Sequence, residues 1–176
     1  LAERLSDAWV MVGGYRNGKG EIDRVLIGPR GIAAIEVKHL RGAIHCAGGR
    51  WWRDRYDRYG NLVAAAEPIA DKGGRGPDRQ LKEPADALQA HLARNGIDGR
   101  VLRLVVFSHE ASWIGRLGGL EADAAATLAA LDLEPLLARS TLRLDAAGVE
   151  RAVVALRCDH DYHERRRARG RAACVQ

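Results

Sequence analysis

Two adjoining runs of alternating apolar residues stand out in the first third of the chain, over residues 21–38. A Gly-Pro-Arg-Gly sequence separates them. Runs rich in Val, Ile and Leu that are bounded by Gly and Pro are typical of β-strands, and the short separation predicts a hairpin. Because side chains alternate between the two faces of a strand, Glu36 and Lys38 share one face, and Ile35 and Val37 share the other.

The length of the hairpin loop decides what faces Glu36. If Pro29 and Arg30 form a two-residue loop, Asp23 lies directly opposite Glu36, with Cβ atoms about 4.5–5.5 Å apart. Two facing carboxylates repel each other, which costs stability unless a cation lies between them. A divalent metal ion with oxygen ligands fits this place, and Lys38 would stand beside it.

Two alternatives remain open. A type I turn followed by a bulged Gly31 would shift the register by one residue and turn Asp23 away from Glu36. The other alternative is a solvated face on which Glu21 and Lys38 form an ordinary cross-strand ion pair. Residue usage favours the metal interpretation, since the chain has 24 Arg and four Lys and yet places a lysine here. The surroundings of a lysine can lower its pKa until it loses its proton near neutral pH, whereas arginine stays protonated.

The rest of the chain is predicted to alternate between short strands and helices. Strands are expected at residues 9–15, 43–46, 50–56, 62–66, 101–108 and 141–144. Helices are expected at 78–95, at 121–139 as one or two helices split near Pro135, and at 146–169, and residues 1–8 read as the tail of another. This order predicts an α/β (α+β mixed) fold in which a central mixed β-sheet is flanked by helices.

Composition limits the class of protein. A chain of 176 residues fits one domain, with residues 1–145 as its core and 146–176 as a C-terminal helix and basic tail. No apolar run is long enough to span a membrane, and three cysteines without CxxC spacing argue against a disulfide framework or a zinc site. We therefore expect a domain trimmed from a longer cytoplasmic protein. The net charge of +5 is compatible with a polyanionic partner.

Several of these residues together resemble the nuclease-related domain (NERD) family. The resemblance covers roughly residues 1–110. It lies in Glu21-Ile22-Asp23-Arg24-Val25-Leu26-Ile27-Gly28-Pro29 with Gly31, in Ile35-Glu36-Val37-Lys38, in Gly42, in Trp51-Trp52 and in Pro77-Asp78-Arg79-Gln80. NERD belongs to the restriction-endonuclease-like superfamily, which is known by a D…(D/E)xK signature.

The resemblance implies a metal-dependent phosphodiesterase. In such a site Asp23 and Glu36 would hold Mg²⁺ or Mn²⁺, and Lys38 would orient or activate the attacking water. Gln80 would lie nearby on a helix. Family members usually carry a glutamate in a helix before the first strand, and Glu3 is the residue here that loosely matches it.

The resulting hypothesis is a nuclease domain that acts on DNA, with the backbone carbonyl of Val37 as a third metal ligand. One alternative is a nucleic-acid- or partner-binding module on the same fold with weak or no cleavage. Another is a structural interaction domain without affinity for nucleic acid.

Other polar and aromatic groups have two readings each. Gln80 is expected at the start of a helix, where backbone N–H groups favour anions. Its side chain either helps to bind a phosphate there or is an ordinary surface glutamine. Trp51 and Trp52 alternate faces, so one of them faces outward. That tryptophan either stacks on a nucleobase or, like its neighbour, only packs against the protein. The nearby Arg50, Arg53, Arg55 and Arg58 contact phosphates or form a solvated strand edge. Asp159 and His163, at i and i+4 of the last predicted helix, either share a metal ion or simply lie on a charged helix face. The arginines at 165–171 are expected to add non-specific affinity for nucleic acid.

Overall fold

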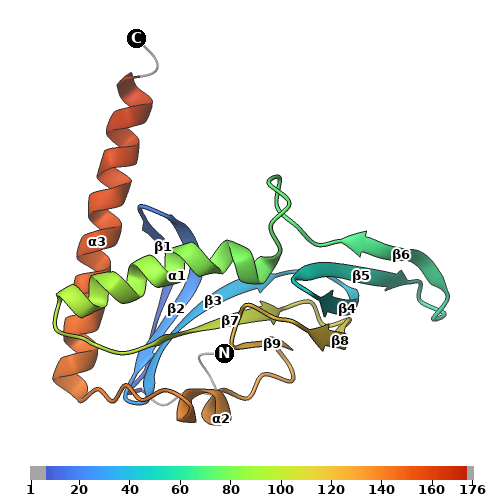
Figure 1. Cartoon of the computed structure of the whole chain (residues 1–176), viewed down its shortest axis with the longest axis horizontal. Helices are drawn as coiled ribbons and strands as arrows, with labels where there is room; N and C mark the ends of the chain where they lie inside the picture. Colours follow the sequence, from blue (N-terminus) through green and yellow to red (C-terminus); the bar gives the residue numbers. More distant parts are fainter. Residues whose placement is uncertain (1–6, 174–176) are drawn as a thin grey trace.

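The computed structural model describes residues 7–173, which form two β-sheets and three helices (Figure 1). The five-stranded sheet has the order β1-β2-β3-β7-β9, with strands Val10–Asn17, Gly20–Gly28, Gly31–Lys38, Val101–Phe107 and Ala124–Thr127. The four-stranded sheet has the order β6-β5-β4-β8, with strands Leu62–Pro68, Arg50–Tyr56, Gly42–Ala47 and Ser112–Gly118. The helices are α1 (Pro77–Arg94), α2 (Leu133–Ala138) and α3 (Ala146–Ala173).

Strand direction makes both sheets mixed. In the five-stranded sheet β2 runs antiparallel to both β1 and β3, whereas β3, β7 and β9 run parallel to one another. In the other sheet β8 runs parallel to β4, and β4, β5 and β6 are antiparallel. The predicted fold class, a mixed sheet flanked by helices, is therefore confirmed. The strands are divided between two sheets, where the sequence predicted one.

The β2–β3 hairpin has the register that the two-residue loop requires. Gly28 pairs with Gly31, and the pairing continues inward to Arg24 opposite Ile35. The bulged alternative is therefore wrong. Gly31 has φ of +135°, a backbone conformation that side chains with a Cβ rarely adopt, so glycine is needed to leave the turn.

Helices cover the two faces of the five-stranded sheet (Figure 1). On one face, α1 and α3 pack through Leu81, Leu88 and Leu156 against β2 and β3 residues such as Val25 and Ile32. On the opposite face, Leu133 and Leu137 of α2 pack against Leu26, Ile35 and Leu104. A third cluster, which includes Trp51 of β5 and Phe107 of β7, joins the two sheets.

Helix and strand predictions are mostly confirmed to within a few residues, with three exceptions. Strand β8 was not predicted. Residues 121–139 contain β9 and one short helix in place of the predicted helices, because Ala124–Thr127 extends the sheet alongside β7. Residues 141–144 form no strand, although Leu144 donates its N–H to the carbonyl of Pro29. The predicted N-terminal helix, including Glu3, lies almost entirely outside the described residues.

Pro84 lies inside α1 without ending the helix. Its carbonyl accepts a hydrogen bond from Asn17 Nδ2, which ties the helix to the β1–β2 turn. Within residues 7–173, no helix is both long and apolar enough to cross a membrane.

Candidate active site

Asp23 lies where β2 and β3 cease to pair. The last paired residues of the two strands are Arg24 and Ile35, so Asp23 is one residue beyond the ladder. Its Oδ2 accepts a hydrogen bond from the backbone N–H of Val37, at 2.7 Å. The carboxylate thus satisfies a backbone donor of β3 that no longer has a strand partner.

The carbonyl of Val37 points to the same edge of β3. In a strand, the N–H and C=O of one residue point to one side, and those of the next residue point to the other. The carbonyl oxygen of Lys38 points toward β7 and accepts a hydrogen bond from the backbone N–H of Ser108 at 3.0 Å. The N–H and C=O of Val37 therefore both point to the edge of β3 where Asp23 lies.

Glu36 is a buried acid, with 7% of its surface exposed. Its Oε1 accepts a hydrogen bond from Lys38 Nζ at 2.6 Å. Burial raises the pKa of Glu36 above its ordinary value, the Lys38 ammonium opposes that shift, and the nearby carboxylates of Asp23 and Glu21 raise the pKa further. A cation beside this carboxylate would relieve the cost of keeping it ionised.

Lys38 is held between two acceptors. Besides Glu36, its Nζ donates to Gln80 Oε1 at 2.9 Å. The side-chain amide of Gln80 is oriented in turn, since its Nε2 donates to the carbonyl of Arg75 at 2.7 Å. An ammonium group has three N–H donors, so one remains for a further acceptor.

A pocket of about 230 Å³ opens beside this group. Its lining includes Lys38 and Gln80, together with Arg53 of β5 and Asp71 of the β6–α1 loop. The sequence places Arg53 near the tryptophans but gives no sign that it shares a pocket with Lys38, because the contact depends on how the two sheets are joined.

Asp78 fixes the start of the helix that carries Gln80. It is fully buried, its Oδ1 accepts from Trp51 Nε1 at 2.9 Å, and its Oδ2 accepts from the backbone N–H of Glu121 at 3.0 Å. The N-cap residue is Gly76, and Asp78 instead binds α1 to β5 and to the chain before β9.

The tryptophan pair divides as the strand alternation predicts. Trp51 is buried against Phe107, and Trp52 is half-buried with its ring stacked on His45 at a centroid distance of 5.4 Å. Trp51 therefore supports Asp78 and the core, and is closed to a nucleobase.

The residues present fit a hard divalent cation with few protein ligands. Within the described part of the chain, no group of three or more His, Cys, Asp or Glu side chains is arranged to hold a metal ion. Mg²⁺ needs fewer, since it usually keeps several waters and takes one or two carboxylates together with substrate phosphates. Asp23, Glu36 and the Val37 carbonyl are the residues that would hold such an ion. Glu21 pairs with Arg16, so the alternative Glu21–Lys38 ion pair is not formed.

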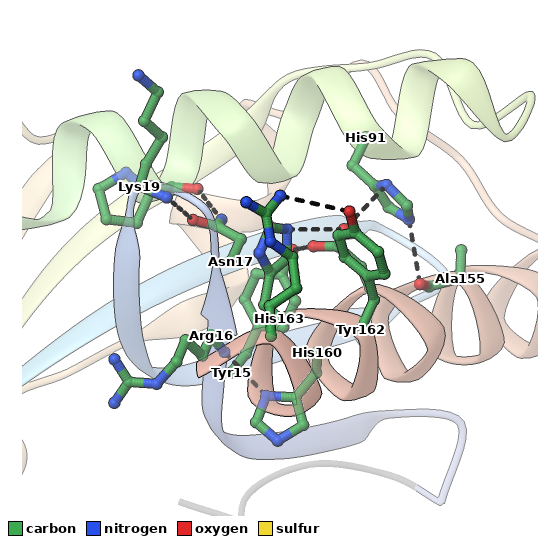
Figure 2. A network of polar contacts seen from close by, with 12 residues as sticks. Tyr15, Arg16, Asn17, Lys19, His91, Ala155, His160, Tyr162 and His163 are labelled. Atoms are coloured by element: carbon green, nitrogen blue, oxygen red, sulfur yellow. Dashed lines mark hydrogen bonds and ion pairs between the residues drawn. The ribbon is translucent and has the colours of Figure 1, made fainter. Parts of the chain in front are cut away.

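A separate network of polar contacts, which includes Tyr15, His91 and His163, joins β1, α1 and α3 (Figure 2), and Asp159 lies at its centre. Its Oδ2 accepts from the hydroxyl of Tyr15 at 2.6 Å, and its Oδ1 lies 3.5 Å from His91 Nδ1 and 3.6 Å from His163 Nε2. Burial, followed by the contact with Asp159, raises the pKa of Tyr15. Through Tyr15 and His91, Asp159 therefore docks α3 onto β1 and α1, while its i, i+4 contact with His163 lies within α3.

Comparison with protein families matches residues 1–108 to the nuclease-related domain. The match covers more than half of the chain and includes the whole β2–β3 hairpin and Gln80. The chain therefore belongs to the nuclease-related domain family. No curated protein and no solved structure matches the chain.

Proposed function

We propose that this domain is a Mg²⁺- or Mn²⁺-dependent nuclease that hydrolyses phosphodiester bonds in DNA. One observation carries the proposal. The end of a single hairpin holds two carboxylates, Asp23 and Glu36, and a lysine amine that Glu36 and Gln80 fix in place. Membership of the nuclease-related domain family supports it.

In this proposal Asp23, Glu36 and the carbonyl of Val37 hold the cation. When bound, the ion would lower the pKa of a coordinated water and neutralise charge on the phosphate. The third N–H of Lys38 would donate to the attacking water or to a non-bridging phosphate oxygen, where negative charge develops. Gln80 would keep the amine aimed at that point, since both ends of its amide are bound.

Hydrolysis also requires that the attacking water be oriented, and in this proposal Lys38 orients it. Because Glu36 and Gln80 already hold the Lys38 amine, its side chain loses little conformational entropy when substrate binds. The pocket beside it gives the phosphate a place to enter.

The direct test is cleavage of labelled single- and double-stranded DNA and RNA in Mg²⁺, in Mn²⁺ and with a chelator. We expect metal-dependent cleavage of DNA that Lys38→Ala reduces by about 10²–10⁴-fold. Lys82→Ala is the matched control, because its amine lies on the same helix as Gln80 but against Glu121. Equal cleavage by Lys38→Ala and the parent protein would overturn the proposal, as would cleavage in the presence of the chelator.

A second candidate is a nucleic-acid-binding module with weak or no cleavage. The observation that favours it is the small acid set, since no three His, Cys, Asp or Glu side chains among the described residues are grouped to hold a metal ion, and Glu21 is bound to Arg16. Salt-sensitive binding of DNA without turnover in Mn²⁺ would support this candidate over the nuclease.

A further inference from the structure

Two arginines of β5 are held side by side by one carboxylate. Glu67 of β6 accepts from Arg53 Nε at 2.9 Å through Oε2 and from Arg55 Nε at 2.8 Å through Oε1. Each guanidinium therefore uses its Nε in the ion pair. Among the described residues, the terminal Nη nitrogens of both arginines have no other hydrogen-bond partner.

A bulge in β6 makes the shared contact possible. Arg53 pairs with Glu67 but Arg55 pairs with Ala64, so β6 has an extra residue between the two positions. Ala66 within the bulge has φ of 53°, which is uncommon for a residue other than glycine, and its N–H donates to Asp54 Oδ1 at 2.7 Å. Bulges of this kind redirect side chains near functional sites.

The arginine pair lies on the side of the sheet that faces the candidate active site. Arg53 and Arg55 share one face of β5, and Arg53 lines the pocket with Lys38 and Gln80. The acid in that wall is already bound, because Asp71 pairs with Arg75 at 2.9 Å. The local charge is therefore positive, since two guanidiniums share a single carboxylate.

We propose that Arg53 and Arg55 form a phosphate-binding subsite for a nucleic-acid backbone, with Glu67 as the residue that positions them. The subsite takes a phosphate neighbouring the one that Lys38 faces, and in this it rests on the proposed function. Two forks with free terminal nitrogens match the oxygens of a phosphodiester, and a phosphate is read without regard to base sequence.

The test is binding of a fluorescently labelled DNA strand, and of its duplex, by anisotropy at several NaCl concentrations. A chelator is present throughout, so binding is measured whether or not the site cleaves. Loss of one phosphate contact lowers the slope of log K against log [NaCl] by about one. We expect a drop of about one for Arg53→Gln and about two for the Arg53→Gln/Arg55→Gln variant.

Two further variants make the result specific. Arg58→Gln removes the same charge from the β5–β6 turn, where Arg58 stacks on Tyr59, and is expected to keep the parent slope. The Arg53→Lys/Arg55→Lys variant keeps both charges beside Glu67. It is expected to fold, to keep the slope, and to bind about tenfold more weakly without the planar forks.

An unchanged slope in the doubly neutralised variant would overturn the subsite, and so would an equal drop in Arg58→Gln or unaltered affinity in the lysine variant. Absence of salt-dependent binding by the parent protein would overturn it as well. Binding with the expected slopes but without cleavage in Mn²⁺ would remove only the nuclease proposal.

Discussion

The carboxylate of Asp23 accepts a hydrogen bond from the backbone N–H of Val37, with 2.7 Å between Oδ2 and the nitrogen. The side chain thereby replaces the strand pairing that ends one residue earlier. It also keeps Asp23 beside the Val37 carbonyl and leaves Oδ1 without a hydrogen-bond partner among the described residues. One contact thus serves the hairpin and the proposed metal site.

Two substitutions at Asp23 are therefore expected to affect stability and activity differently. Asp23→Asn keeps an oxygen that accepts from Val37 but loses the negative charge, so its free energy of unfolding should change by less than about 0.5 kcal/mol while metal-dependent cleavage is lost. Asp23→Ala also loses the hydrogen bond, at a cost of about 1 kcal/mol. Urea unfolding and cleavage assays on the same preparations check both. Full activity in Asp23→Asn would contradict the assignment.

Glu36 gives the domain a predictable pH dependence. Because its pKa is raised in the folded state, the folded protein holds this proton at pH values where the unfolded chain has released it. The contribution of Glu36 to the free energy of unfolding should therefore fall as the pH rises from about 4.5 through the raised pKa. The difference between the parent protein and Glu36→Gln, measured by urea unfolding with a chelator, isolates that contribution. A difference that does not vary with pH would contradict this prediction.

Gln80 is expected to act through Lys38. Gln80→Leu removes the acceptor of Lys38 Nζ and the link to the Arg75 carbonyl, so the amine loses one of its two fixed contacts. Misplacement of a catalytic group costs up to about 10²-fold, so cleavage should fall by less than in Lys38→Ala. Asp86→Ala, an exposed change on the same helix, is the control. A Gln80→Leu variant with parent kcat would show that the contact has no role in catalysis.

Asp78 is expected to contribute to stability more than any surface acid. Asp78→Ala leaves Trp51 Nε1 and the N–H of Glu121 without their acceptor in a buried place. Each buried donor left unpaired costs about 1–3 kcal/mol, so we expect a loss of about 3 kcal/mol in the free energy of unfolding. Chemical unfolding measures it. A loss no greater than that of Asp86→Ala would mean that Asp78 does not anchor α1.

Local turn chemistry made the β2–β3 hairpin predictable from the sequence. The sequence left two turns open, a two-residue loop and a bulged turn at Gly31, and only the two-residue loop directs Asp23 toward Glu36. The structure has the two-residue loop, with Gly28 paired to Gly31. Strand β9 was not predictable in this way. Its alanines have no preference for strands, and they form one only because β7 offers a free edge.

The contacts that complete the site depend on packing between distant segments. Lys38 meets Gln80, and Asp78 meets Trp51, only after the two sheets and α1 have been joined. The Glu67 contact with both Arg53 and Arg55 depends on the bulge at Ala66, and an alanine with positive φ leaves no signal in the sequence. For Gln80 the resemblance to the nuclease-related domain supplied what spacing alone did not.

The most direct measurement is the binding of Mn²⁺ to the metal-free protein, followed by electron paramagnetic resonance as free Mn²⁺ is titrated. We expect a saturable site of one ion per chain. That site should be lost in Asp23→Asn and should weaken as the pH falls and Glu36 takes up a proton. Equal Mn²⁺ binding by Asp23→Asn and the parent, or no saturable binding by the parent, would contradict the proposed metal site.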